Sequence, residues 1–121
     1  MIEHTTPLDE VVRTGEIIDA AISQRLIENI FFKNSPLHDG AMIIGKKRIK
    51  AAGCILPVSH DLNIPKELGL RHRAAMGISQ KSDAHAIIVS EETGAISVAY
   101  RGQFYLRLNA EELESLLTKE N

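Results

Sequence analysis

The clearest pattern of apolar and polar positions lies in the last third of the chain. Apolar residues recur at every second position, or in β-branched runs, over residues 86–90, 96–100 and 104–108, and turn residues separate these runs. A period of two is typical of strands, and short breaks that contain Gly are typical of hairpins. The region is therefore predicted to form a three-stranded meander, in which Phe104, Leu106 and Leu108 share one face.

Other segments repeat apolar residues with the spacing of a helix. Ser23 is a predicted N-cap, and Asn109 with Glu112 forms a predicted capping box at the start of a closing helix. Thr6 is predicted to cap a short helix that ends before residue 15, and residues 71–78 are predicted to form a helix with a basic first turn. The apolar stripe after Ser23 consists of Leu26, Ile27, Ile30 and Phe31.

The middle of the chain holds strand-like runs. Residues 16–22 predict a short extended segment, and Ala41–Gly45 and about Ile49–Pro57 predict a hairpin across the basic tip Lys46-Lys47-Arg48. Both runs of the hairpin are apolar on consecutive positions, which is typical of strands covered on both faces. The order of elements indicates an α/β fold, a single domain with a central mixed β-sheet flanked by helices.

Composition narrows the class of protein. A chain of 121 residues with 44% hydrophobic residues has the size and the apolar content of one domain. A net charge of −2 argues against wrapping a nucleic-acid backbone, which calls for a basic domain. No apolar run approaches the roughly 18 residues of a membrane span. The single cysteine, Cys54, lies in an apolar run, so it is expected to be a small buried side chain without a disulfide partner.

Two polar clusters stand out as candidate chemistry. The first is Leu37-His38-Asp39-Gly40-Ala41, an acid and a histidine before a glycine, and the second is Arg71-His72-Arg73 at the start of a predicted helix. Cations at a helix N-terminus face its partial positive charge, and a bound anion reverses the sign of that interaction. The second cluster therefore predicts a phosphate clamp, with about 1.5–3 kcal/mol for each charge-assisted hydrogen bond. Glu91 and Glu92 offer carboxylates for a divalent ion beside those phosphates.

Each cluster by itself also has a structural interpretation. Asp39-Gly40 is a common turn, Arg71-His72-Arg73 can be a solvated first turn, and Ser90–Gly94 can be an ordinary hairpin tip. Gly40 to Lys47 matches a phosphate-binding P-loop up to its last position, but the residues between its glycines predict a strand, so we reject that motif. The chain has no HExxH, paired CxxC or GxSxG motif, so nothing supports a zinc protease, a zinc ribbon or a serine hydrolase.

Taken together, Pro36–Ala41, Arg71–Ala75 and Ser90–Gly94 closely resemble the motifs of the diadenylate cyclase catalytic domain, most of all in the membrane-anchored bacterial CdaA type. The likeness runs from about Ile17 to the closing helix. It implies an enzyme that condenses two ATP molecules into cyclic di-AMP and two pyrophosphates, with Mn²⁺, Mg²⁺ or Co²⁺. It also implies a homodimer, because each active site holds one ATP and two sites meet face to face.

The resemblance implies a role for each matching residue. Asp39 would activate the 3′-hydroxyl of ATP, and the backbone at Gly40 and Ala41 would let the nucleotide approach. The residues implied to act in catalysis are Asp39, Gly40, Ala41, Arg71, His72 and Arg73. Those implied to bind the nucleotide, at the adenine or at the phosphates, are Met42, Leu56, Arg71, His72, Arg73 and Ser90. The implied metal ligands are His38, Asp39, Glu91 and Glu92.

The chain departs from the family pattern in two places. Leu70 stands where family members usually carry Thr. Almost all of the transmembrane helices, helix and strand that precede the segment near Thr6 in the membrane-anchored members is missing here, and Met1-Ile2-Glu3 is expected to be the tail of that strand. We expect residues 1–121 to be an N-terminally truncated catalytic domain, the cytoplasmic part of a protein anchored in the cell membrane. The alternatives are a nucleotide-binding module of the same fold without catalysis, and an interaction domain that binds no nucleotide.

Overall fold

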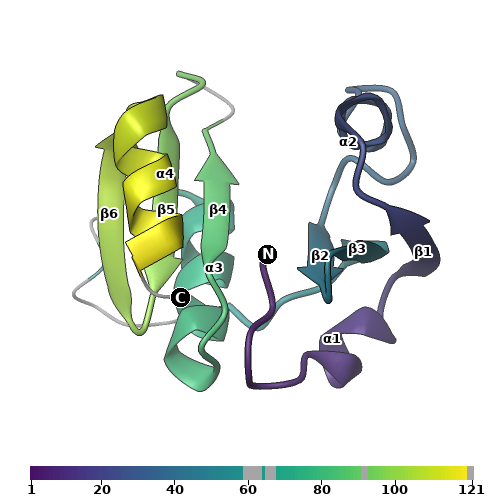
Figure 1. The fold of residues 1–121 in the computed structure, drawn as a ribbon, viewed down its shortest axis with the longest axis horizontal. Coiled ribbons are helices and arrows are strands. Elements are labelled where there is room, and N and C mark those ends of the chain that lie inside the picture. Colours follow the sequence, from purple (N-terminus) through teal and green to yellow (C-terminus); the bar gives the residue numbers. More distant parts are fainter. Residues whose placement is uncertain (59–63, 65–67, 91–92, 120–121) are drawn as a thin grey trace. The chain divides into compact units, whose positions relative to one another are not determined.

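The computed structural model describes residues 1–58, 64, 68–90 and 93–119 (Figure 1). The chain divides into two compact units, Met1–Leu56 and Pro57–Asn121. Glu91 and Glu92, two of the predicted metal ligands, lie outside the described residues. No helix in the described part of the chain is both long and apolar enough to span a membrane.

The first unit is built on a three-stranded antiparallel sheet with the strand order β1-β3-β2. Its elements are α1 (Asp9–Val12), β1 (Glu16–Ala21), α2 (Gln24–Ile30), β2 (Ala41–Gly45) and β3 (Arg48–Cys54). Lys46 and Lys47 form the turn between β2 and β3, both with positive φ (52° and 62°), as in the tight turns that suit the twist of a hairpin. The predicted hairpin is confirmed, although β3 ends at Cys54 and not at Pro57.

The core of the first unit lies under α2. Ile30 packs there with three buried residues of the hairpin, and Leu26 and Ile27 contact the same cluster, so the predicted stripe is confirmed for these three side chains. Phe31 is exposed because α2 ends at Ile30. The predicted cap is also confirmed, since the Ser23 hydroxyl accepts a hydrogen bond from the Leu26 amide at 3.1 Å. The hairpin residues of this cluster are Met42, Ile49 and Ala52.

The start of α1 differs from the sequence-based expectation. The helix begins after Leu8, without a capping side chain at that position, so the prediction of Thr6 as the N-cap is wrong. The Leu8 amide instead donates to the Glu3 carboxylate at 2.8 Å, and the same carboxylate pairs with Lys50 at 2.6 Å. Burial raises the pKa of Glu3, but the hydrogen bonds from Lys50 and Leu8 and the Lys50 charge outweigh burial and hold that pKa below its ordinary value. A partly buried ion pair between segments distant in sequence has thus replaced a local cap.

The second unit contains a meander with the strand order β4-β5-β6, and this part of the prediction is confirmed. Its elements are α3 (Leu70–Lys81), β4 (Ala86–Val89), β5 (Ile96–Tyr100), β6 (Gln103–Leu108) and α4 (Ala110–Lys119). The predicted capping box is also present: the Glu112 amide donates to Asn109 Oδ1 at 2.8 Å, and the Asn109 amide donates to Glu112 Oε1 at 3.0 Å.

The two helices of this unit pack on opposite faces of its sheet. Phe104 of β6 contacts His72 of α3, whereas the next residue, Tyr105, lies against α4. Successive residues of a strand point to opposite faces, so α3 and α4 sandwich the sheet. Figure 1 shows α4 across the near face of this sheet. The predicted alternation fails at Leu106, which is 44% exposed, because a bulge with Arg107 at φ 53° interrupts β6.

The expected α/β class, with helices packed on a sheet, is confirmed. The named strands form two three-stranded antiparallel sheets, where the sequence predicted one central sheet. A parallel bridge between Ile2 and Ile44 makes the first sheet mixed, because the residues before α1 pair along the edge of β2. Cys54 is buried as expected, and burial raises the pKa of its thiol.

Candidate functional site

The Asp39-Gly40 turn is fixed by close packing of backbone on backbone. Gly40 has φ 111°, and a Cβ added there would lie 2.9 Å from the carbonyl oxygen of Cys54 and from the carbonyl carbon of Gly53. Only glycine adopts this positive φ without strain and also leaves room for the neighbouring backbone. Ala41 then pairs with Cys54 as the hairpin begins. The Asp39 side chain is 81% exposed, so a rigid support presents this carboxylate to solvent.

His38 lies beside Asp39 with its ring orientation fixed. Its Nδ1 is 2.9 Å from the carbonyl oxygen of Ser35, and because a carbonyl only accepts, Nδ1 carries the proton and donates. Nε2 is then the nitrogen that faces the Asp39 carboxylate, at 3.3 Å. Histidines that bind metals commonly donate their other ring N–H to a backbone carbonyl in this way.

These two side chains suit the proposed metal ions. Carboxylate oxygens are preferred by Mg²⁺ and Mn²⁺, and an imidazole nitrogen also suits transition ions such as Co²⁺. Over the described ranges of the chain, no group of three or more His, Cys, Asp and Glu residues gathers closely enough to hold an ion. His38 and Asp39 therefore fit part of a coordination sphere, and the predicted Glu91 and Glu92 ligands lie outside the described residues.

Arg71, His72 and Arg73 occupy the first turn of α3, as predicted. Gly69 is the N-cap and makes no side-chain hydrogen bond, so no capping side chain at that position competes for the amides of the first turn. Backbone N–H groups at a helix start, together with guanidinium groups, favour phosphate binding. The first turn of α3 thus has the chemistry of an anion site.

The structure links Arg71 to the turn that contains Ser90. Arg71 Nη1 donates to the carbonyl oxygen of Val89 at 3.0 Å, one residue before Ser90. The Ser90 amide donates to the Ala95 carbonyl at 2.9 Å, and the Ser90 hydroxyl accepts from the Thr93 amide at 3.3 Å. Two predicted phosphate ligands, which are distant in sequence, are therefore brought together in the second unit.

His72 differs from its two basic neighbours. Its ring packs edge-on against Phe104, with 6.1 Å between the ring centroids, and burial lowers the pKa of the imidazole below its ordinary value of 6.5. The side chain is therefore mainly neutral at pH 7. It is suited to a contact as a neutral imidazole, and the cationic groups of this turn are the guanidinium groups of Arg71 and Arg73.

The two residues predicted at the adenine lie in the first unit, in different settings. Met42 is only 7% exposed and packs into the core with Ile30 and Ile49. Leu56 is half-buried and follows β3 by two residues. Sequence reasoning missed Gly53, which has φ 65° and supports Gly40. A glycine inside a strand pattern often marks close backbone approach, and that signal was present.

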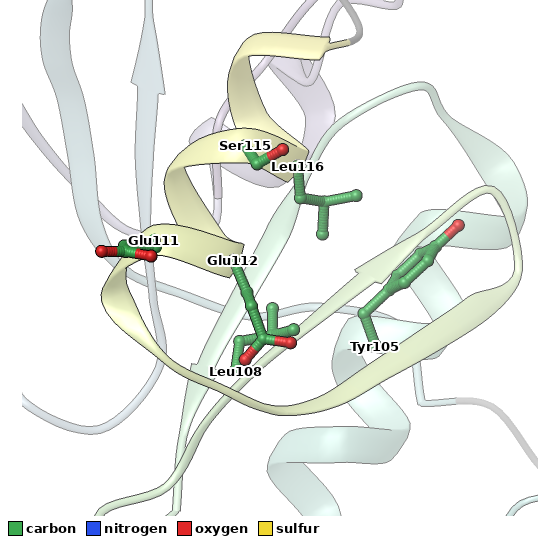
Figure 2. A pocket seen from close by; sticks show the side chains of 6 residues that line it. All are labelled: Tyr105, Leu108, Glu111, Glu112, Ser115 and Leu116. Atoms are coloured by element: carbon green, nitrogen blue, oxygen red, sulfur yellow. The ribbon is translucent and has the colours of Figure 1, made fainter.

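A hollow between β6 and α4 is separate from these residues. It measures about 390 Å³ and holds none of the predicted site residues. Figure 2 shows Glu112 beside Leu108 and Glu111 directed away from that pair. Because Glu112 already accepts the hydrogen bond of the capping box, we do not assign this hollow to the site. Its lining consists of Tyr105, Leu108, Glu111, Glu112, Ser115 and Leu116.

The chain is similar to a known protein family and to named members of it. Residues 1–104 match the family described as DAC, DisA bacterial checkpoint controller nucleotide-binding. The cyclic di-AMP synthase CdaA of Bacillus subtilis is 48% identical, and a diadenylate cyclase of Listeria monocytogenes is 45% identical, each over 98% of this chain. The chain spans 44% of the length of each of these two relatives.

Solved structures show the same likeness. The crystal structure of a double mutant of DacA from Staphylococcus aureus superposes with a TM-score of 0.94 at 48% identity, covering 98% of this chain and 79% of that one. A Bacillus cereus structure titled as a hypothetical membrane spanning protein gives a TM-score of 0.85 at 41% identity, covering 89% of this chain and 53% of that one. These matches confirm the fold.

Proposed function

The chain belongs to the DAC family of diadenylate cyclases, and from this premise we propose that it condenses two ATP molecules into cyclic di-AMP and two pyrophosphates. One observation carries the proposal. The exposed Asp39 carboxylate stands on a backbone turn that only glycine can form, in a chain 48% identical to a named cyclic di-AMP synthase. A carboxylate held on a rigid backbone turn is suited to accept a proton from a hydroxyl group at one fixed position.

Asp39 is proposed to accept the proton of the ATP 3′-hydroxyl. The 3′-oxygen then attacks the α-phosphorus of the second ATP, the bond from that phosphorus to the bridging oxygen breaks, and pyrophosphate leaves with the electron pair. The 3′-oxygen of the second ATP then attacks the α-phosphorus of the first in the same way, a second pyrophosphate leaves with its electron pair, and the ring closes. Because the product has two-fold symmetry, two copies of the chain facing each other supply the two acids.

His38 and Asp39 would hold the divalent ion, with Glu91 or Glu92 as further ligands. The family is generally metal-dependent. When bound, Mn²⁺, Mg²⁺ or Co²⁺ offsets the charge of the phosphates. His38 is oriented for this role by its hydrogen bond to the Ser35 carbonyl, which leaves Nε2 facing the Asp39 carboxylate.

The first turn of α3 is proposed to hold the phosphates. Arg71 and Arg73 supply charge, Ser90 supplies a hydroxyl, and His72 contributes a neutral imidazole. A guanidinium carries five N–H donors, so the Arg71 bond to Val89 is compatible with a phosphate contact by the same side chain.

Leu56 is proposed to form the wall against the adenine. Met42, buried behind the hairpin surface, would support that wall from the core. An uncharged base needs an apolar slot of this kind. The backbone at Gly40 and Ala41 would lie against the nucleotide on the side of the Asp39 turn.

We also propose that the parent protein carries this domain on the cytoplasmic side of a membrane. The named relatives are more than twice as long as the matched region, and one structural neighbour is titled as membrane spanning. ATP, the proposed substrate, is a cytoplasmic nucleotide.

The test is incubation of the purified chain with ATP and Mn²⁺, followed by chromatography with mass detection. Cyclic di-AMP should form, with a rate that rises more steeply than the protein concentration, because the reaction needs two copies. Omission of the metal ion is the control. Binding of ATP without conversion at any protein concentration would contradict the proposal and would leave a nucleotide-binding module.

A further inference from the structure

Thr14 connects two backbone segments of the first unit. Its hydroxyl donates to the Val11 carbonyl at 2.6 Å and accepts a hydrogen bond from the Ile55 amide at 2.8 Å. The second bond joins residues 41 positions apart in the sequence. A single hydroxyl therefore ties the end of α1 to the chain as it leaves β3.

The end of β3 is held between two turns. A Cβ at Gly15 would meet the Ala52 carbonyl oxygen and would lie 2.6 Å from Cys54 Sγ, and a Cβ at Gly40 would lie 2.9 Å from the Cys54 carbonyl oxygen. The strand order β1-β3-β2 places β1, which follows Gly15, and β2, which follows Gly40, on opposite sides of β3. The Thr14-Gly15 turn thus faces the Asp39-Gly40 turn across β3.

The Ile55 side chain is 71% exposed and has little packing to hold it. The hydrogen bond from its amide to the Thr14 hydroxyl is therefore the described contact that fixes this residue. Leu56 is the next residue, and the Ile55 Cα from which it continues lies in the same peptide plane as the hydrogen-bonded Ile55 N–H. A hydrogen bond on the Ile55 amide therefore also limits where the Leu56 side chain lies.

We infer that Thr14 is a positioning residue for the adenine wall of the nucleotide site, because its hydroxyl holds the Ile55 amide and thereby orients Leu56. This inference rests on the proposed function, in which Leu56 contacts the base. Thr14 touches neither substrate nor metal in this scheme. Its loss should weaken the binding of ATP while leaving the chemistry at Asp39 intact, since small displacements of positioning groups impair binding and alignment.

The test compares Thr14→Val, which keeps the branched shape and removes the hydroxyl, with Thr14→Ser, which keeps the hydroxyl. Thr14→Val should raise KM for ATP about 3- to 10-fold with kcat almost unchanged, because one neutral hydrogen bond is lost from a binding wall. Thr14→Ser should restore KM to within about twofold of the unsubstituted protein. Thr14→Ala is the second variant, with KM shifted in the same direction as in Thr14→Val.

Thr118→Val is the matched control. The Thr118 hydroxyl bonds only to carbonyls inside α4, Glu114 at 2.9 Å and Ser115 at 3.4 Å, among the described contacts. Its removal should leave KM unchanged. An unchanged KM in Thr14→Val, or a raised KM that Thr14→Ser does not restore, would overturn the inference.

Other outcomes separate this inference from the proposed function. A lower kcat and a lower melting temperature at unchanged KM would reveal a merely structural Thr14 and would also overturn the inference. If the unsubstituted protein makes no cyclic di-AMP, the proposed function fails and takes the inference with it. If the unsubstituted protein is active and Thr14→Val has the same KM, the inference alone fails.

Discussion

The Asp39-Gly40 turn and the Ser90 turn present candidate site residues by different means. At the first turn, backbone packs on backbone, and a Cβ at Gly40 would lie 2.9 Å from the Cys54 carbonyl oxygen. At the second, backbone hydrogen bonds from Ser90 to Ala95 and from Gly94 to Ser90 form the turn, and side chains add further bonds. Arg71 donates to Val89, and the Ser90 hydroxyl accepts from the Thr93 amide. A Cβ added at Gly40 meets backbone atoms, whereas a Cβ added at Gly94 in the second turn meets no atom of the described residues within 4 Å. The two turns should therefore respond differently to substitution.

Asp39→Asn should have the largest effect. The amide cannot accept the proton of the 3′-hydroxyl as a carboxylate does, so kcat should fall by about 10²- to 10⁴-fold. The melting temperature should hardly change, because the side chain is 81% exposed. Steady-state kinetics and thermal unfolding measure the two quantities.

Asp19→Asn is the matched control for that experiment. Asp19 is also an exposed acid with a basic neighbour, Arg48 at 2.8 Å, and Asn tolerates its positive φ of 49°. Its kcat should stay within about twofold of the unsubstituted protein, since exposed ion pairs contribute little. Retained turnover in Asp39→Asn would contradict the role of Asp39 as the proton acceptor.

Gly40→Ala should have the next largest effect, now on folding. A side chain at φ 111° is strained, and the added Cβ meets backbone that cannot move aside. The free energy of unfolding should fall by about 3 kcal/mol or more. Gly94→Ala in the Ser90 turn is the matched variant, with φ 74° and no atom of the described residues within 4 Å of the added Cβ. It should lose only about 1–2 kcal/mol, from the backbone conformation alone.

Denaturant unfolding of both glycine variants measures the difference between the two turns. Equal losses of unfolding free energy in the two variants would mean that the close packing at Gly40 relaxes freely. The proposed difference between the two turns would then be wrong.

The sequence predicted best the features that depend on local pattern. Three of the four residues of the predicted stripe (Leu26, Ile27 and Ile30), the meander and the Asn109 capping box all follow from spacing within a few residues. Thr6 and Leu106 were predicted wrongly because non-local contacts decided them. The Glu3 carboxylate, which pairs with Lys50, 47 positions along the chain, took the Leu8 amide. A bulge against β5 changed the face on which β6 residues lie.

The candidate site shows the same division. The residue types around Asp39 and Arg71 could be identified from sequence, because acids, guanidinium groups and glycines in short clusters indicate phosphate chemistry. The contacts that hold these residues in place could not be identified from the sequence. The contact of Gly53 with the Asp39 turn and the bond from Arg71 to Val89 depend on register and packing between segments that are distant in sequence.

Arg71→Lys tests the contact between Arg71 and the residue before Ser90. Lysine keeps the charge but cannot contact the Val89 carbonyl and a phosphate with the planar fork of a guanidinium. The ratio kcat/KM should fall about tenfold, the loss of roughly one charge-assisted contact. Arg25→Lys, an exposed position on α2, is the control and should leave kcat/KM unchanged. An Arg71→Lys variant with full activity would show that charge alone suffices at this position.

His72→Gln should have the smallest effect, a change in the pH dependence of stability. Burial lowers the pKa of the His72 imidazole in the folded protein, so the unfolded chain binds this proton more tightly. The contribution of His72 to the free energy of unfolding is then fully present above the ordinary pKa of 6.5. It is lost as the pH falls from there through the lowered pKa of the folded protein. Glutamine can still pack on Phe104 but does not titrate, so its melting temperature should fall less between pH 7.5 and pH 5.5 than that of the unsubstituted protein. Equal falls in His72→Gln and in the unsubstituted protein would show that His72 does not contribute to the loss of stability at low pH.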